Sequence, residues 1–252
     1  MSRPILKKSM VQSMQSLRVN RSGKESLAKS LERRVEDLFQ NVPSMELTVS
    51  RQQGNFEVRT EFDGDGGRHI SVCQVQKVDN ITPDDYFLFF DNFSEEFANV
   101  NPMVEECTIL EPASSDDKEQ REGVKVCYDL PFPWQNRVAF HYKYLLKNRI
   151  PNEHILILSN VDNQKLLEDH VTEADLEDYV LAHIFLEVYW VKPIKDDEGE
   201  IVGSSVNYAF SGDMAGSVPQ WIQNSVAPKN AIGAVQNLLE FIQKKKAGGN
   251  ES

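Results

Sequence analysis

The sequence predicts an α+β fold in which a curved antiparallel sheet of about nine strands wraps around one long C-terminal helix, with an internal hydrophobic cavity between them. Three observations predict it. Apolar residues recur at helical spacing in residues 217–246, and short segments with strand-like patterns fill most of the chain before them. One of these segments, residues 179–193, has a continuous apolar face. Such a face needs a cover, which the terminal helix can supply.

The composition fits one large domain with tails. The chain has 252 residues, of which 40% are hydrophobic, and its formal net charge is −12. Residues 1–24 contain basic residues and no acid, so the rest of the chain is strongly acidic. Because a nucleic-acid partner requires Lys and Arg to neutralise its phosphates, we do not expect one. The cysteines lie apart in strand-like segments, which predicts buried reduced thiols and a reducing compartment: Cys73, Cys107 and Cys127.

We divide the chain into a basic N-terminal segment (residues 1–24), one folded domain (residues 25–246) and a disordered tail (residues 247–252). The N-terminal segment has apolar residues at helical spacing: Leu6, Met10, Met14 and Leu17. Three interpretations stay open for it: a mitochondrial targeting peptide, a basic amphipathic segment that touches anionic membranes, or a disordered tail. No apolar run approaches the ~18 residues of a transmembrane helix. We therefore expect a cytoplasmic protein peripheral to membranes, with mitochondrial targeting as the alternative.

The first half of the domain mixes helices and strands. Residues 26–42 form a helix that stops before Pro43, and residues 45–51, 55–62 and 69–78 form a meander of strands. The DGDGG run at residues 63–67 superficially suggests a calcium loop, but it lacks the acid at the last loop position, so a hairpin turn is predicted. Residues 82–100 form a second helix, which starts at Thr82 and carries one face of phenylalanines: Phe87, Phe90, Phe93 and Phe97.

The second half is predicted to consist of strands joined mostly by hairpins. They span residues 104–111, 123–129, 138–146, 154–161, 179–193 and 202–211, and a longer acidic connection lies at residues 162–178. Prolines stiffen the loop at residues 129–137, which exposes Phe132 and Trp134. The apolar face of residues 179–193 consists of Val180, Ala182, Ile184, Leu186, Val188 and Trp190. The opposite face carries His183, Glu187 and Lys192 among apolar residues.

The terminal helix follows a glycine-containing loop at residues 212–216. Ser217 can cap it, and Pro219 lies just inside, where its missing N–H costs nothing. The apolar stripe continues to Ile242, and Pro228 is expected to kink or interrupt it after the first turns. Lysines at residues 244–246 suit the negative end of the helix dipole.

Three segments of the sequence resemble the START family, the lipid-transfer domains related to the steroidogenic acute regulatory protein. They are NVNPMVEECTILE, VKVCYDLPFPWQNRVAFHYKY and FSGDMAGSVPQWIQNSVAPKNAIGAVQNLLEFI, and the resemblance covers about residues 26–246. It implies the helix-grip fold and a monomer that binds one lipid, a sterol or a phospholipid, in an internal tunnel and carries or senses it. It also implies transient contact with a membrane surface.

The resemblance implies two groups of site residues. The lipid-binding group consists of Phe90, Phe97, Arg137, Lys143, Ile184, Trp190, Tyr208 and Phe210. The gate group, on the loops at residues 130–136 and 212–218 and on the terminal helix, consists of Phe132, Trp134, Met214, Val218, Trp221 and Ile222. The family often has Asp where Val138 stands, and the headgroup-binding Arg and Asp of a phosphatidylcholine-binding member fall near Phe97 and Asn101. The lipid class therefore stays open.

Some alternatives remain at this stage. Arg137 either pairs with an acid and holds the gate, touches a headgroup, or forms a surface salt bridge. Lys143 either contacts the ligand or is solvated together with His141, the latter if the residues on the opposite face of their strand point into the core: Val138, Phe140, Tyr142 and Tyr144. The histidines are dispersed, and the sequence has no HExxH, GxSxG, P-loop or GxGxxG motif, so we expect no enzyme, metal or cofactor. A lipid-gated interaction module and a helix-grip enzyme acting on a hydrophobic substrate are the alternative functions.

Overall fold

The computed structural model describes residues 27–42, 56–62, 69–113, 120–130, 133–215 and 220–248. The predicted N-terminal segment, the predicted strand at residues 45–51 and the DGDGG run lie outside the described residues. Within these ranges the strands are β1 (Phe56–Phe62), β2 (His69–Asp79), β3 (Val104–Glu111), β4 (Gln120–Tyr128), β5 (Arg137–Leu146), β6 (His154–Ser159), β7 (Val180–Leu181), β8 (His183–Lys195) and β9 (Ile201–Asp213). The helices are α2 (Leu27–Asn41), the 3-10 helix η2 (Pro83–Tyr86), α3 (Phe87–Phe90), α4 (Phe93–Val100), α5 (Gln164–His170), α6 (Glu173–Asp178) and α7 (Gln220–Gly248).

The strands form one sheet in the order β1-β2-β9-β8-β6-β5-β4-β3, with β7 paired in parallel to β5 beside this path. All neighbours along the path are antiparallel. The pairing of Phe62 with His69 confirms that β1 and β2 form a hairpin. The predicted antiparallel sheet of about nine strands is thus confirmed for the described part of the chain.

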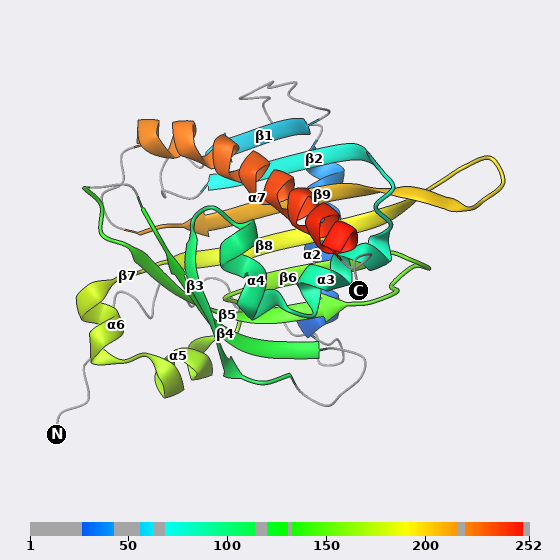
Figure 1. Ribbon diagram of the computed structural model, residues 1–252. Helices are drawn as coiled ribbons and strands as arrows, with labels where there is room; N and C mark the ends of the chain where they lie inside the picture. The colour runs from blue at the N-terminus through cyan, green and yellow to red at the C-terminus, as the bar shows by residue number, and fades with distance from the viewer. Residues whose placement is uncertain are drawn as a thin grey trace.

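The inner face of the sheet is the face that α7 covers. Figure 1 shows α7 lying across the sheet, with α3 and α4 on the same side. Its buried side chains join the larger core cluster: Ala231, Ala234, Val235, Leu238 and Ile242. The end of α7 is fastened by Lys245 to Glu96 of α4 at 2.9 Å and by Lys246 to Asp85 of η2 at 2.7 Å. These contacts give the terminal lysines partners beyond the helix dipole.

Helix α7 does not break at Pro228. It continues as one helix of 29 residues, so the expected interruption is wrong. A proline inside a helix removes one backbone hydrogen bond, and the packed side chains that follow Pro228 hold the helix together across this loss. The helix ends at Gly248, so the start of the predicted disordered tail is helical.

The outer face of the sheet carries a second apolar cluster under α2. Ala28, Leu31 and Val35 of α2 are buried against β5 and β6 residues such as Phe140 and Ile157. Leu166 of α5 belongs to the same cluster. Figure 1 shows α2 on the side of the sheet opposite α7. Both faces of the sheet are therefore covered, which explains why β5 and β6 are buried almost throughout.

The predicted apolar face of β8 is split between the two sides of the sheet. The pairing of β8 with β9 shifts register between Ile184 and Leu186, so a bulge lies there. A one-residue slip moves all following side chains to the other face. Ile184 and Tyr189 consequently belong to the inner cluster, whereas Val188 and Trp190 belong to the outer one. The single apolar face predicted for residues 180–190 is wrong.

Candidate functional site

One row of directly paired residues crosses the inner face of the sheet and carries most of its polar side chains. We call it the polar row; it consists of Thr60, Ser71, Phe210, Glu187, Leu158, Lys143 and Glu122, on β1, β2, β9, β8, β6, β5 and β4. Directly paired residues point to the same side of a sheet. The polar row therefore lies on the face that α7 covers, next to the larger core cluster.

Glu187 is the fully buried acid of this row. Its Oε1 accepts hydrogen bonds from Asn101 Nδ2 and Tyr208 Oη, both at 3.0 Å, while its Oε2 has only Tyr128 Oη at 3.5 Å. Burial raises the pKa of Glu187 to about 7, against the opposing effect of these three donors. At neutral pH the carboxyl group therefore exchanges between its protonated and ionised forms.

Tyrosine rings surround Glu187. Tyr189 and Tyr208 pack with their ring centroids 4.9 Å apart, and Phe89 of α3 meets Tyr189 at 5.7 Å. The hydroxyl of Tyr189 is buried and has no hydrogen-bond partner among the described residues. A buried polar atom without a partner is costly, so this hydroxyl and the weakly held Oε2 of Glu187 mark an incompletely satisfied polar site.

Lys143 and His141 also face this side of the sheet. Lys143 is 4% exposed, forms an ion pair with Glu122 at 2.5 Å and lies 5.5 Å from the ring centroid of Phe93 on α4. His141 is fully buried, and neither of its ring nitrogens has a partner in the part of the chain that the structure describes. Burial lowers the pKa of His141 to about 3, so the ring is neutral at physiological pH.

The burial of His141 and Lys143 corrects one alternative. Their neighbours Val138, Phe140, Tyr142 and Tyr144 do face a core, namely the outer cluster, yet His141 and Lys143 are not solvated. The reason is that β5 is covered on both faces, by α2 and α5 on one side and by α4 on the other. Lys143 already has Glu122 as its counter-ion.

The other predicted lipid-binding residues divide between the two faces. Phe90, Phe97, Ile184 and Tyr208 belong to the inner cluster, and Phe210 packs against it. Trp190 lies on the outer face, where its ring meets Phe39 of α2 at a centroid distance of 5.4 Å. The structure therefore separates Trp190 from the other members of the predicted group.

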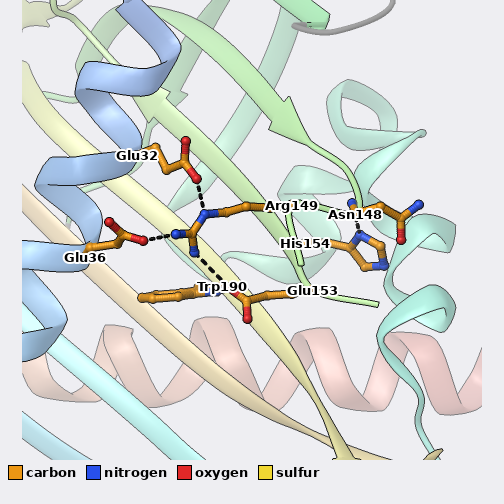
Figure 2. Close-up of polar contacts among 7 residues, drawn as sticks. All are labelled: Glu32, Glu36, Asn148, Arg149, Glu153, His154 and Trp190. Atoms are coloured by element: carbon orange, nitrogen blue, oxygen red, sulfur yellow. Dashed lines mark hydrogen bonds and ion pairs between the residues drawn. The ribbon is translucent and has the colours of Figure 1, made fainter. Parts of the chain in front are cut away.

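Figure 2 shows what holds Trp190 on the outer face. Its Nε1 donates to Glu153 Oε1 at 2.7 Å, and the same carboxylate pairs with Arg149 at 2.9 Å. Arg149 also pairs with Glu32 and Glu36 of α2. This group of contacts, which we call the Arg149 junction, fastens α2 to the turn between β5 and β6.

Arg137 connects the two predicted gate loops. Its Nε donates to the carbonyl of Met214 at 2.5 Å and its Nη2 to the carbonyl of Ala215 at 3.0 Å, after β9. Its Nη1 donates to the carbonyl of Gln135 in the loop before β5. Burial lowers the pKa of Arg137, and Asp213 acts in the opposite direction. Arg137 thus binds backbone carbonyls of both loops.

The remaining gate residues are only partly described. Met214 is buried and Trp134 is half-buried. Phe132 and Val218 lie outside the described residues, and Trp221 and Ile222 belong to the first turns of α7 without described side chains.

The cysteines are unpaired thiols; burial raises the pKa of Cys73 and of Cys107 to about 12. In the described ranges no His, Cys, Asp or Glu group is arranged to hold a metal, and no helix is long and apolar enough to cross a membrane.

Comparison with known proteins assigns the fold. Neither protein-family models nor curated proteins match the chain. Among solved structures, human STARD10 superposes with a TM-score of 0.60 and 15% identity over 84% of this chain and 81% of its own. Human StAR-related lipid transfer protein 5 gives 0.58 and 11% over 87% and 97% of the two chains. A STAR-related lipid transfer protein from Xanthomonas axonopodis gives 0.56 and 15% over 77% and 97%.

These similarities confirm the predicted fold class. The chain has the helix-grip α+β fold of START domains, with the antiparallel sheet and the terminal helix that the sequence predicted. Sequence reasoning did not place Glu187 in the site. One sequence feature could have identified Glu187: it is an acid in the middle of a predicted strand whose other residues are nearly all apolar. A charged residue is rarely buried at such a position without a reason.

Proposed function

We propose that this protein binds one lipid between the inner face of the sheet and α7 and carries it between membranes. The observation that supports this proposal best is the incompletely satisfied polar site within the inner apolar cluster. The Tyr189 hydroxyl and both ring nitrogens of His141 are buried without hydrogen-bond partners among the described residues. An apolar interior with a few unsatisfied polar groups suits an apolar ligand that has one polar end.

The solved structures with this fold support the same class of function. Two of the proteins compared above are named for lipid transfer, human StAR-related lipid transfer protein 5 and the STAR-related lipid transfer protein from Xanthomonas axonopodis. In our proposal the acyl or ring portion of the lipid replaces contacts within the inner cluster, and burial of apolar surface at about 25 cal/mol per Å² stabilises the complex. The protein acts as a monomer that touches membranes transiently and does not catalyse a reaction.

In this proposal, lipid enters the interior between the loop after β9 and the loop before β5, which Arg137 joins. Release of its bonds to the carbonyls of Met214 and Ala215 would free the start of α7 from the sheet. Trp134, half-buried on the same loop, is suited to a membrane surface because indole rings are favoured at the interface between lipid and water.

The test is native mass spectrometry of the full chain, purified from a eukaryotic host and also incubated with vesicles of sterol, phospholipid and sphingolipid. We expect a complex with one lipid per chain that survives repurification. A protein that arrives empty and takes up no lipid from any of the vesicles would contradict the proposal. Transfer of a labelled lipid between donor and acceptor vesicles then separates a carrier from a lipid-gated interaction module.

A further inference from the structure

The buried acid at the centre of the polar row has no positively charged partner in the part of the chain that the structure describes. Among the described residues, no ion pair involves Glu187, and its own partners are the neutral groups of Asn101, Tyr128 and Tyr208. The nearest candidate cation of the row, Lys143, is paired with Glu122 at 2.5 Å. An ionised carboxylate buried without a counter-charge is strongly unfavourable, so this position requires either a proton or a cation from outside the protein.

Aromatic rings and hydroxyl groups surround Glu187. Three tyrosines converge on it, namely Tyr128 from β4, Tyr189 from β8 and Tyr208 from β9, and Phe89 of α3 packs against Tyr189. Aromatic rings attract cations through their negative faces, and the attraction is strongest where water is absent. The weakly held Oε2 and the unpartnered hydroxyl of Tyr189 are open to an N–H donor.

We propose that the interior site selects a lipid whose polar end is a protonated amine, with the ammonium group against Glu187 and the hydrocarbon chain in the inner apolar cluster. This inference rests on the proposed function, because it names the class of lipid that the same interior takes. A carboxylate or phosphate at this position would face Glu187 without a free cation to receive it. A hydroxyl group would find a hydrogen-bond partner there but would leave the charge unbalanced.

Among the described residues, no other titratable group that faces Glu187 can replace the ligand in this role. The neighbouring groups are the phenols of Tyr128, Tyr189 and Tyr208 and the thiol of Cys107 on β3, all of which burial keeps neutral. From α7 the inner cluster receives aliphatic and alanine side chains, such as Val235 and Leu238. His141 is neutral, because its ring is fully buried.

The experiment uses three lipids that differ only at the polar end: octadecylamine, octadecanol and octadecanoate. Each is supplied to the full chain at the same mole fraction in phosphatidylcholine vesicles, and uptake is measured by native mass spectrometry after repurification. We expect the amine to be taken up in preference to the alcohol and the alcohol in preference to the acid. Because ionisation of Glu187 favours the ammonium, amine uptake should rise about tenfold between about pH 6 and about pH 8.

Two variants assign the effect to the site. Glu187→Gln keeps the size of the side chain and should lower the affinity for octadecylamine by about tenfold to a hundredfold, the range of a charge-assisted hydrogen bond, while octadecanol binds as before. Tyr189→Phe removes a hydroxyl that has no partner within the described chain, so the variant should fold normally and bind the amine less tightly. Glu198→Gln, in the exposed turn after β8, makes the same change of charge away from the interior and should bind as the parent does.

Each outcome decides between the proposals. Equal uptake of the three lipids, preference for the alcohol or the acid, or an equal loss in the Glu187→Gln and Glu198→Gln variants would overturn the amine inference. Uptake of phospholipid or sterol from the vesicles without uptake of the amine would overturn it while leaving the proposed function in place. Failure to take up any lipid at all would contradict both.

Discussion

Glu187 couples the stability of the fold to pH, because burial raises its pKa from 4.5 to about 7. Between these two values the folded protein holds a proton that the unfolded chain has released. Stability from this group is therefore complete below about pH 4.5 and is lost as the pH rises through about 7. We expect Glu187→Gln, which cannot ionise, to be more stable than the parent at about pH 8, by up to about 3 kcal/mol, and nearly equal to it at about pH 4.

Urea unfolding of both proteins at the two pH values measures this difference. Glu198→Gln serves as the matched control. Because Glu198 is exposed, its substitution should change the free energy of unfolding little at either pH. A Glu187→Gln variant whose difference from the parent is the same at both pH values would show that Glu187 is ionised, or protonated, in the folded and unfolded states alike.

At the level of single residues, the sequence predicted the apolar members of the interior better than the polar ones. Phe90 and Phe97 were recognisable from their helical spacing and are buried as expected. Glu187 and His141 were not placed, because alternation along a strand says which residues share a face but not whether the other face is also covered. That depends on α2 and on the helices between β2 and β3, which pack against strands distant in sequence.

At the level of elements, most strands could be read from their patterns, whereas two local features could not. The bulge after Ile184 in β8 reverses the faces of the residues that follow it, and no glycine or proline lies beside it in the strand to indicate it. Helices α5 and α6 were predicted as a connection, because they are short and mostly polar. Only Leu166 of α5 and Asp175 of α6 are buried, and a single buried residue per helix leaves no apolar stripe to recognise.

The Arg149 junction is expected to carry much of the attachment of α2. Arg149→Met removes the pairs with Glu32 and Glu36 and leaves the buried carboxylate of Glu153 with the indole of Trp190 as its one remaining side-chain partner among the described residues. We expect a loss of about 1–3 kcal/mol in the free energy of unfolding, because a largely buried acid loses a charged partner.

The matched control for the junction is Lys165→Met, which breaks an exposed ion pair with Asp169 on α5. Exposed pairs contribute little, so its cost should be much smaller than that of Arg149→Met. Thermal unfolding and limited proteolysis within α2 measure both variants. Equal stability of the two variants would mean that the apolar stripe of α2 holds the helix without the junction.

Arg137 is expected to control the opening of the site. Arg137→Lys keeps the charge, but one ammonium group cannot reach the three carbonyls that the guanidinium holds, so the start of α7 should loosen. Under the proposed function we expect faster exchange of bound lipid with vesicles, and faster amide exchange at residues 208–215. Arg121→Lys, whose side chain stacks on Tyr142 on the outer face, is the matched control. Equal rates of lipid exchange and amide exchange for the two variants would show that Arg137 does not control the opening of the site.

For the molecule as a whole, one sheet separates two apolar layers with different tasks. The outer layer under α2 contains Trp190 and the Arg149 junction, in which the indole of Trp190 donates to Glu153. The inner layer under α7 contains Glu187, whose Oε2 is weakly held, and the Tyr189 hydroxyl and His141 ring nitrogens, which have no partner among the described residues. The outer layer can hold the curvature of the sheet while the inner layer exchanges its own contacts for those of a ligand, because the strands between them are shared.

The division into an inner and an outer layer predicts different consequences for two matched leucine-to-alanine substitutions. Leu31→Ala on α2 and Leu238→Ala on α7 each remove a fully buried side chain and should each cost about 2–5 kcal/mol of stability. Only Leu238→Ala alters the layer in which we propose that lipid binds. We therefore expect lipid uptake, and the rise in unfolding temperature that it causes, to be retained in Leu31→Ala and weakened in Leu238→Ala. Because ligand stabilisation depends only on affinity for the folded state, the comparison holds although both variants start from a lower stability. Retention of uptake in Leu238→Ala together with its loss in Leu31→Ala would place the ligand on the outer face instead.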